Sequence, residues 1–254
     1  MSPAPALTES PPHLITCNNT EESNRVASTF RRPTTIPFVV SRQGEEAVTV
    51  DYLEADEYGL HYVDETALDR DSERVLWARC TFNLTNDGDL RGRPDFASLH
   101  PFRQRACMEK LLCQVCVPRV KNLPTTNELG TLFIVPPGVE KEYGLEGAVT
   151  SHPPLCVPHA QQSMRECPHL AKGAQAVRAR KPQLWGVHGV VYKKRDDGLA
   201  PIEKLSSAIP YGNPVLPWML ASQMYMRLGG VTVVDLETEA SRASNHVPAT
   251  FSRR

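Results

Sequence analysis

The sequence has no apolar run that approaches about 18 residues, the length that a membrane-spanning helix requires. It begins Met-Ser-Pro-Ala-Pro, with neither a basic n-region nor an apolar h-region. It also has no glycine-rich phosphate loop, no G-x-S-x-G elbow and no dinucleotide fingerprint. We therefore expect a cytoplasmic protein without a membrane partner, and the motifs of the common nucleotide-binding and serine-hydrolase classes are missing.

Positive and negative side chains are nearly balanced, and the formal net charge is −1. A nucleic-acid surface would therefore have to come from local segregation of charge. The 254 residues are 41% hydrophobic and 22% charged, which is ordinary for a globular protein with one substantial core. We expect a disordered tail over residues 1–33, a single domain over 34–238 and a C-terminal tail over 239–254.

The seven cysteines are an odd number, and two of them form the pair Cys113-Gln-Val-Cys116. A chain of this size without a signal sequence favours metal-bound thiolates over disulfides. About forty residues later comes Cys156-Val-Pro-His159. Two pairs of soft or borderline ligands, each with a two-residue gap, can close a tetrahedron around one ion. The spacing predicts a Zn²⁺ site made by Cys113, Cys116, Cys156 and His159.

The fourth ligand has alternatives. Cys167 and His169 follow the second pair, and His152 precedes it. Four protein ligands would make a closed structural site, whereas three ligands and a water would leave a position able to polarise a substrate. We expect the closed site.

The order of elements around these ligands is informative. A first pair on a knuckle precedes a predicted strand at residues 132–135, and the second pair opens a predicted helix over 160–167, whose N-terminus favours thiolate. In this order residues 113–170 resemble treble-clef zinc fingers, which implies the same four residues as ligands. The whole chain also resembles uncharacterised actinobacterial proteins with a Leu-Leu-Cys-Gln-Val-Cys segment and a later His-Pro-Pro-x-Cys segment. Neither resemblance implies an activity, because a fold of this kind hosts many functions.

The remaining patterns predict an α+β fold. Short β-branched and aromatic segments between residues 35 and 82 predict an antiparallel β-meander. Residues 101–112 predict a helix that buries Met108, Leu111 and Leu112. A strand over 184–192, a helix over 214–228 and a strand over 231–236 predict a C-terminal strand–helix–strand unit. The stripe expected on the second helix is Leu216, Met219, Leu220, Met224 and Leu228.

Two classes of function follow from these patterns. In the first, the zinc finger and a basic patch bind a protein or a nucleic acid; the patch would consist of Arg103, Arg105, Lys110, Arg119 and Lys121. In the second, an enzyme of specialised metabolism has a zinc-supported pocket lined by His152, Cys167 or His188. A His-Asn-His-type nuclease is a third reading with His152 near the general-base position, but no asparagine lies between residues 128 and 170.

Overall fold

The computed structural model describes residues 35–48, 52–116, 125–137, 144–196, 198–202 and 207–245. The tail predicted over residues 1–33 lies outside these ranges, as does the end of the chain after residue 245.

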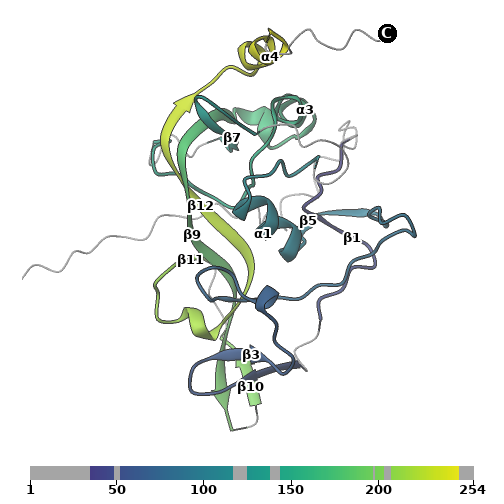
Figure 1. Ribbon diagram of the computed structural model, residues 1–254, viewed down its shortest axis with the longest axis vertical. Coiled ribbons are helices and arrows are strands. Elements are labelled where there is room, and N and C mark those ends of the chain that lie inside the picture. The colour runs from purple at the N-terminus through teal and green to yellow at the C-terminus, as the bar shows by residue number, and fades with distance from the viewer. Residues whose placement is uncertain are drawn as a thin grey trace, which may run out of the picture.

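Two long antiparallel strands, β9 (Gln175–Arg195) and β12 (Met219–Val233), are the central element of the molecule (Figure 1). The main sheet runs β4-β12-β9-β7-β6, with β8 paired to β12 and both β10 and β11 paired to β9. The shorter strands are β4 (Leu76–Trp77), β6 (Thr126–Asn127), β7 (Gly130–Val135), β8 (Val149–Thr150), β10 (Gly198–Pro201) and β11 (Ile209–Pro210). Because β9 spans 21 residues, its two ends carry different parts of the protein.

The helix predicted over residues 214–228 is wrong, since most of this segment is strand β12. The pairing with β9 shifts between Ala221 and Gln223, so Ser222 is an extra residue. This bulge changes the phase of the in-out alternation by one position. The altered phase imitates the spacing of a helix and explains the error. The residues that β12 contributes to the main core are Met219, Ala221, Met224, Met226 and Leu228.

The N-terminal meander is also wrong, because these short strands find different partners. Strand β1 (Val40–Arg42) pairs with β5 (Pro94–Leu99), β2 (Leu53–Ala55) pairs with β3 (Leu60–Tyr62), and β4 runs parallel to β12. Burial of apolar side chains explains these pairings. The apolar residues of β2, β3 and β4 pack with Tyr192 of β9. Strand β1 is instead linked to α1, because the Arg103 guanidinium donates a hydrogen bond to the backbone carbonyl of Val40.

Three α-helices are described: α1 (Pro101–Glu109), α3 (Val157–Glu166) and α4 (Leu236–Asn245). The predicted helices at α1 and α3 are confirmed. Helix α4 replaces the expected polar tail after residue 238, and the Asp235 carboxylate caps it by accepting the Thr238 N–H at 2.8 Å. Short 3-10 turns occur at Ala67–Asp69, Leu170–Lys172 and Leu216–Trp218. None of the described helices is long and apolar enough to cross a membrane. Sheet and helices together confirm the α+β class.

Among the residues that the structure describes, the core forms three clusters distributed along the long strands. The largest lies between α1 and the middle of β9 and β12. The second joins β7, α3, α4 and the cysteine segments, and the third lies under β2 and β3. Figure 1 shows α3, α4 and β7 at one end of the long strands and β3 and β10 at the other.

Candidate metal centre

The first ligand pair is positioned by the end of α1. Leu111 adopts a left-handed conformation with φ 50°, and the Leu112 N–H donates to the Cys107 carbonyl at 2.9 Å, as in a Schellman ending. The Thr125 hydroxyl donates to the Leu111 carbonyl at 2.6 Å. These bonds end the helix and turn the chain into Cys113.

The second ligand pair is positioned by α3. Backbone bonds of 3.0 Å join the Gln114 N–H to the Pro154 carbonyl and the Leu155 N–H to the Leu132 carbonyl of β7. The next residue, Cys156, is the N-cap of α3, and His159 lies in the first turn of the helix. The knuckle and the helix start are therefore held together by the backbone independently of the four side chains.

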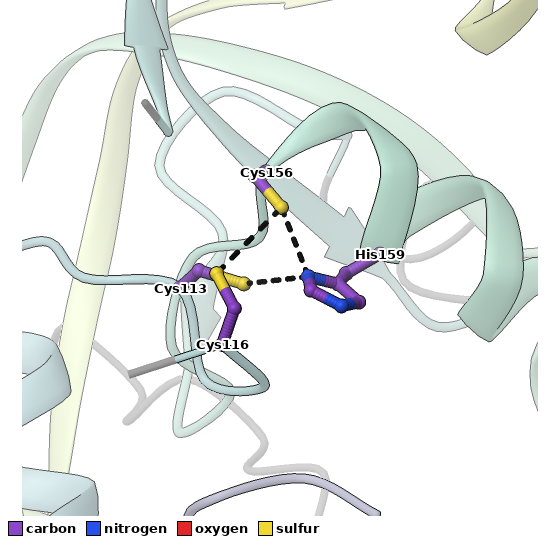
Figure 2. Close-up of side chains that lie close together, drawn as sticks. All are labelled: Cys113, Cys116, Cys156 and His159. Atoms are coloured by element: carbon purple, nitrogen blue, oxygen red, sulfur yellow. Dashed lines mark hydrogen bonds between the residues drawn. The ribbon is translucent and has the colours of Figure 1, made fainter. Parts of the chain in front are cut away.

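The four side chains converge on one point (Figure 2). Their ligand atoms, three Sγ and the His159 Nδ1, all lie within 4.8 Å of one another. The Cys116 and Cys156 sulfurs are 4.0 Å apart, and the His159 Nδ1 lies 3.6 Å from the Cys113 sulfur and 3.0 Å from the Cys156 sulfur. Around a tetrahedral zinc, bond lengths of about 2.3 and 2.0 Å place ligand atoms about 3.5 to 3.8 Å apart. The group therefore has the size that a Cys₃His site requires, and it could hold a metal ion.

Burial and hydrogen bonding shift the pKa values of two of these thiols in opposite directions. Cys113 and Cys156 are buried, and the surrounding cluster includes Leu132, Leu155 and Ala160. The side-chain hydrogen bond with Cys156 lowers the pKa of the Cys113 thiol to about 4, although burial opposes this. The same bond, together with burial, raises the pKa of Cys156. Metal binding needs deprotonated thiols, so a cation bound among these sulfurs would release their protons.

The alternative ligands do not join this group. Among the described residues, the group of metal-ligating side chains is formed by the four predicted residues, and Cys167, His169 and His152 are not part of it. Cys167 is the C-cap of α3, and His169 precedes the next short turn. His152 follows β8 and lines a separate cavity of about 10 Å³, where burial lowers its pKa.

His188 lies on β9 opposite Gln223, away from this group. The neighbouring glycines Gly186 and Gly189 allow backbones to approach each other closely. A Cβ on Gly186 would come within 2.1 Å of the Ile209 carbonyl oxygen, and one on Gly189 equally close to that of Leu220. Burial lowers the pKa of His188, which fits a neutral side chain. The three catalytic candidates His152, Cys167 and His188 are thus not brought together.

The prediction of a basic patch on α1 is wrong for Arg103 and Arg105. Arg103 is buried, with 0% of its side chain exposed, and it forms a bidentate pair with Glu45 at 2.5 and 2.7 Å. Arg105 donates to Glu109 at 2.8 Å and to two backbone carbonyls. Lys110 is exposed, whereas Arg119 and Lys121 lie outside the described residues. The guanidinium groups of α1 are therefore paired within the protein and do not form a basic surface. Of the predicted apolar stripe, Met108 is buried and both leucines are half-buried.

A second buried ion pair lies near the candidate metal centre and was not predicted. Arg178 of β9 donates to Glu239 of α4 at 2.5 and 3.0 Å, and both side chains are 3% exposed. Arg178 also donates to the carbonyls of Thr125 and Gly130, on either side of the β6–β7 turn. No local sequence signal could have found this pair, because its partners are 61 residues apart.

Comparisons with protein-family models, with curated proteins and with solved structures find no match to this chain. The resemblance to actinobacterial proteins therefore stays a prediction from the sequence.

Proposed function

We propose that the protein binds one Zn²⁺ through Cys113, Cys116, Cys156 and His159, and that the ion has a structural role. The convergence of these four groups from two segments about forty residues apart is the observation that carries the proposal. Three sulfurs and one imidazole form a donor set suited to zinc, and four protein ligands leave no position for a substrate. The site would be of the treble-clef type, because a knuckle, the β6–β7 hairpin and a helix start follow in that order.

The ion would stabilise the end of the molecule that contains α3 and α4. The cluster around the cysteines includes residues of β7, of α3 and, through Leu236 and Ala240, of α4. Binding energy at such a site is folding energy, since the site does not exist in the unfolded chain. Zinc would therefore fix the relative positions of the knuckle, both helices and the hairpin.

We further propose that this unit is a binding module for a macromolecule, with a protein as the partner. A closed site supports recognition rather than catalysis. A nucleic acid is less well supported, because the guanidinium groups of Arg103 and Arg105 are used internally. A mobility-shift assay with labelled DNA and RNA at about 50 mM salt should show no complex, whereas a shift lost at higher salt would make a nucleic acid the partner.

Metal analysis of purified variants tests the zinc site itself. Cys116→Ser should lose zinc and lower the thermal midpoint, since a hydroxyl replaces a thiolate ligand. Cys167→Ser is the matched control, because this half-buried cysteine lies outside the group and should retain one zinc per chain. Equal zinc content in the two variants would contradict the proposed ligand set.

The described residues also form a cavity of about 660 Å³ between β1, β5 and the main sheet. Neither the four metal-site residues nor His152, Cys167 and His188 line it. The described residues therefore give no support to a pocket built around zinc.

A further inference from the structure

The β2–β3 hairpin lies at the end of the long strands that is remote from the candidate metal centre (Figure 1). One face of this hairpin is covered, because Leu53, Leu60 and Tyr62 are buried in a cluster with Tyr192 of β9 and Leu199 of β10. Successive side chains of a strand point to opposite faces. The residues between these apolar positions therefore form an outer face that the core does not use.

Two cross-strand pairs make up this outer face. Glu54 lies opposite His61, and their side chains approach to 3.6 Å. The hairpin continues by one more pair, because the Val63 N–H donates to the Tyr52 carbonyl at 3.1 Å. Residues that lie directly opposite each other in an antiparallel pair are close enough for their side chains to act together. The outer face thus combines a tyrosine and a valine with a carboxylate and an imidazole.

The apolar side chains of the hairpin are strongly exposed. Tyr58, in the β2–β3 turn, is 79% exposed, Val63 is 64% exposed and Tyr52 is 52% exposed. The turn is ordered, since the Tyr58 N–H donates to the Asp56 carboxylate at 2.8 Å. Single exposed apolar residues are normal, but a group of them on one element is typical of an interaction surface. Tyrosine is also among the residues that contribute most to protein interfaces.

Acidic side chains border the same face. Glu54, Asp56 and Glu57 are exposed, and among the described residues no lysine or arginine forms an ion pair with them. Residues 52–75 as a whole contain eight acidic residues and two arginines. The face is therefore bordered by negative charge that the protein itself does not neutralise.

The basic residues at this end of the molecule do not lie on the outer face. Lys193, Lys194 and Arg195 belong to β9, the strand that covers the buried face of the hairpin through Tyr192. Arg79 is bonded to the carboxylate of Asp64 at 2.7 Å. Neither group of cations competes for the carboxylates of the hairpin turn.

We propose that the outer face of the β2–β3 hairpin is a docking surface for a basic segment of a partner protein. Tyr52, Tyr58 and Val63 would contact the apolar side chains of that segment. Glu54 and Glu57 would pair with its lysine or arginine residues, and this complementarity of charge would speed the encounter and exclude acidic partners. The surface goes beyond the role proposed for the metal centre and does not depend on zinc, because it lies at the other end of the long strands.

Fluorescence anisotropy with two labelled peptides tests the proposal on the full chain. The first peptide alternates lysine with leucine, and the second alternates glutamate with leucine. The lysine peptide should bind at about 50 mM salt and bind more weakly as salt is added, because exposed charges are screened. The glutamate peptide should not bind.

Two variants with matched controls locate the binding site. Tyr58→Ser should weaken binding of the lysine peptide about tenfold, as expected for an interface tyrosine. Val233→Ser is its control, because Val233 is 58% exposed at the opposite end of β12. Glu57→Lys should also weaken binding, whereas Glu237→Lys changes the net charge equally on exposed helix α4 and should not. These positions are all exposed, so the circular dichroism spectrum should not change.

Several results would overturn the proposal. They are failure of the lysine peptide to bind at low salt, equal binding of both peptides, and a hairpin variant that binds like its control. Sedimentation of the chain alone tests the other occupant of the surface. A dimer that dissociates in Tyr58→Ser would make a second copy of this chain the partner and would also overturn the proposal.

Discussion

The cysteine group at one end of the long strands and the Arg103–Glu45 pair beside α1 are both buried, yet they are built on opposite chemistry. In the ion pair the charges cancel, and two bonds of 2.5 and 2.7 Å link the partners directly. In the cysteine group, three sulfurs and an imidazole face one another without a counter-charge among them, and the pKa of the Cys113 thiol is lowered. The ion pair needs no further partner, because its two side chains neutralise each other. The cysteine group has the size and the donor atoms to bind an added cation. The two regions of this protein should therefore respond differently to metal.

Removal of metal should have the largest effect and should be confined to one end. A chelator should lower the thermal midpoint by more than about 10 °C, because structural zinc contributes several kcal/mol to folding. Hydrogen exchange should accelerate at the amides of Leu155 and Ala160. The His100 amide, bonded to the Val39 carbonyl at 2.9 Å, should keep its protection. If the chelator accelerated exchange equally at all of these amides, or at none of them, the claim that metal stabilises only one end of the molecule would be contradicted.

Loss of the Glu45 charge should have the next largest effect, and it should leave metal binding intact. Glu45→Gln leaves the buried Arg103 without its counter-charge, which costs about 3 to 5 kcal/mol of unfolding free energy. Denaturant unfolding measures this, with Glu46→Gln as the exposed control. The double variant Glu45→Leu with Arg103→Met should be more stable than Glu45→Gln. If the unfolding free energy fell by less than about 1 kcal/mol, the ion pair would instead be exposed to solvent.

The Arg178–Glu239 pair should give a smaller effect at the metal end. Glu239→Gln should cost about 2 kcal/mol, since Arg178 retains its bonds to two backbone carbonyls. Hydrogen exchange should then accelerate in α4 but not in α1. Glu237→Gln, at an exposed position of the same helix, should change little. Equal effects of the two substitutions would show that the buried pair does not hold α4.

A last effect, no larger than that of Glu239→Gln, depends on pH. Hydrogen bonds from Arg79, opposed by burial, lower the pKa of Asp69 to about 2. Because the pKa of a free aspartate is about 3.9, the folded state favours the charged form; the resulting stability, about 2 kcal/mol, is present above pH 4 and is lost as pH falls towards 2. The difference in unfolding free energy between wild type and Asp69→Asn should therefore shrink over this interval. A difference that does not depend on pH would contradict the assignment.

The contrast between the two regions also explains what could be predicted from the sequence. The ligands Cys113 and Cys116, like Cys156 and His159, are neighbours in the chain, so their spacing reveals the group. Glu45 and Arg103 are 58 residues apart, and nothing local distinguishes a buried arginine from an exposed one on α1. The predicted basic patch failed at Arg103 for this reason.

The fold was predictable in its class and in helices α1 and α3, where proline and helix-forming residues act locally. It was not predictable in β12, where the extra Ser222 breaks the period-two pattern, or in the pairing of β1 with β5. The cavity was missed because its lining is assembled from four distant segments with bulged strands.

X-ray absorption at the zinc edge, on protein purified without chelator and incubated with one equivalent of zinc, tests the central claim most directly. We predict one ion per chain with three sulfur neighbours at about 2.3 Å and one nitrogen at about 2.0 Å. A shell made mainly of oxygen, or a protein that does not retain zinc after dialysis, would contradict the claim that these four side chains form a structural metal site.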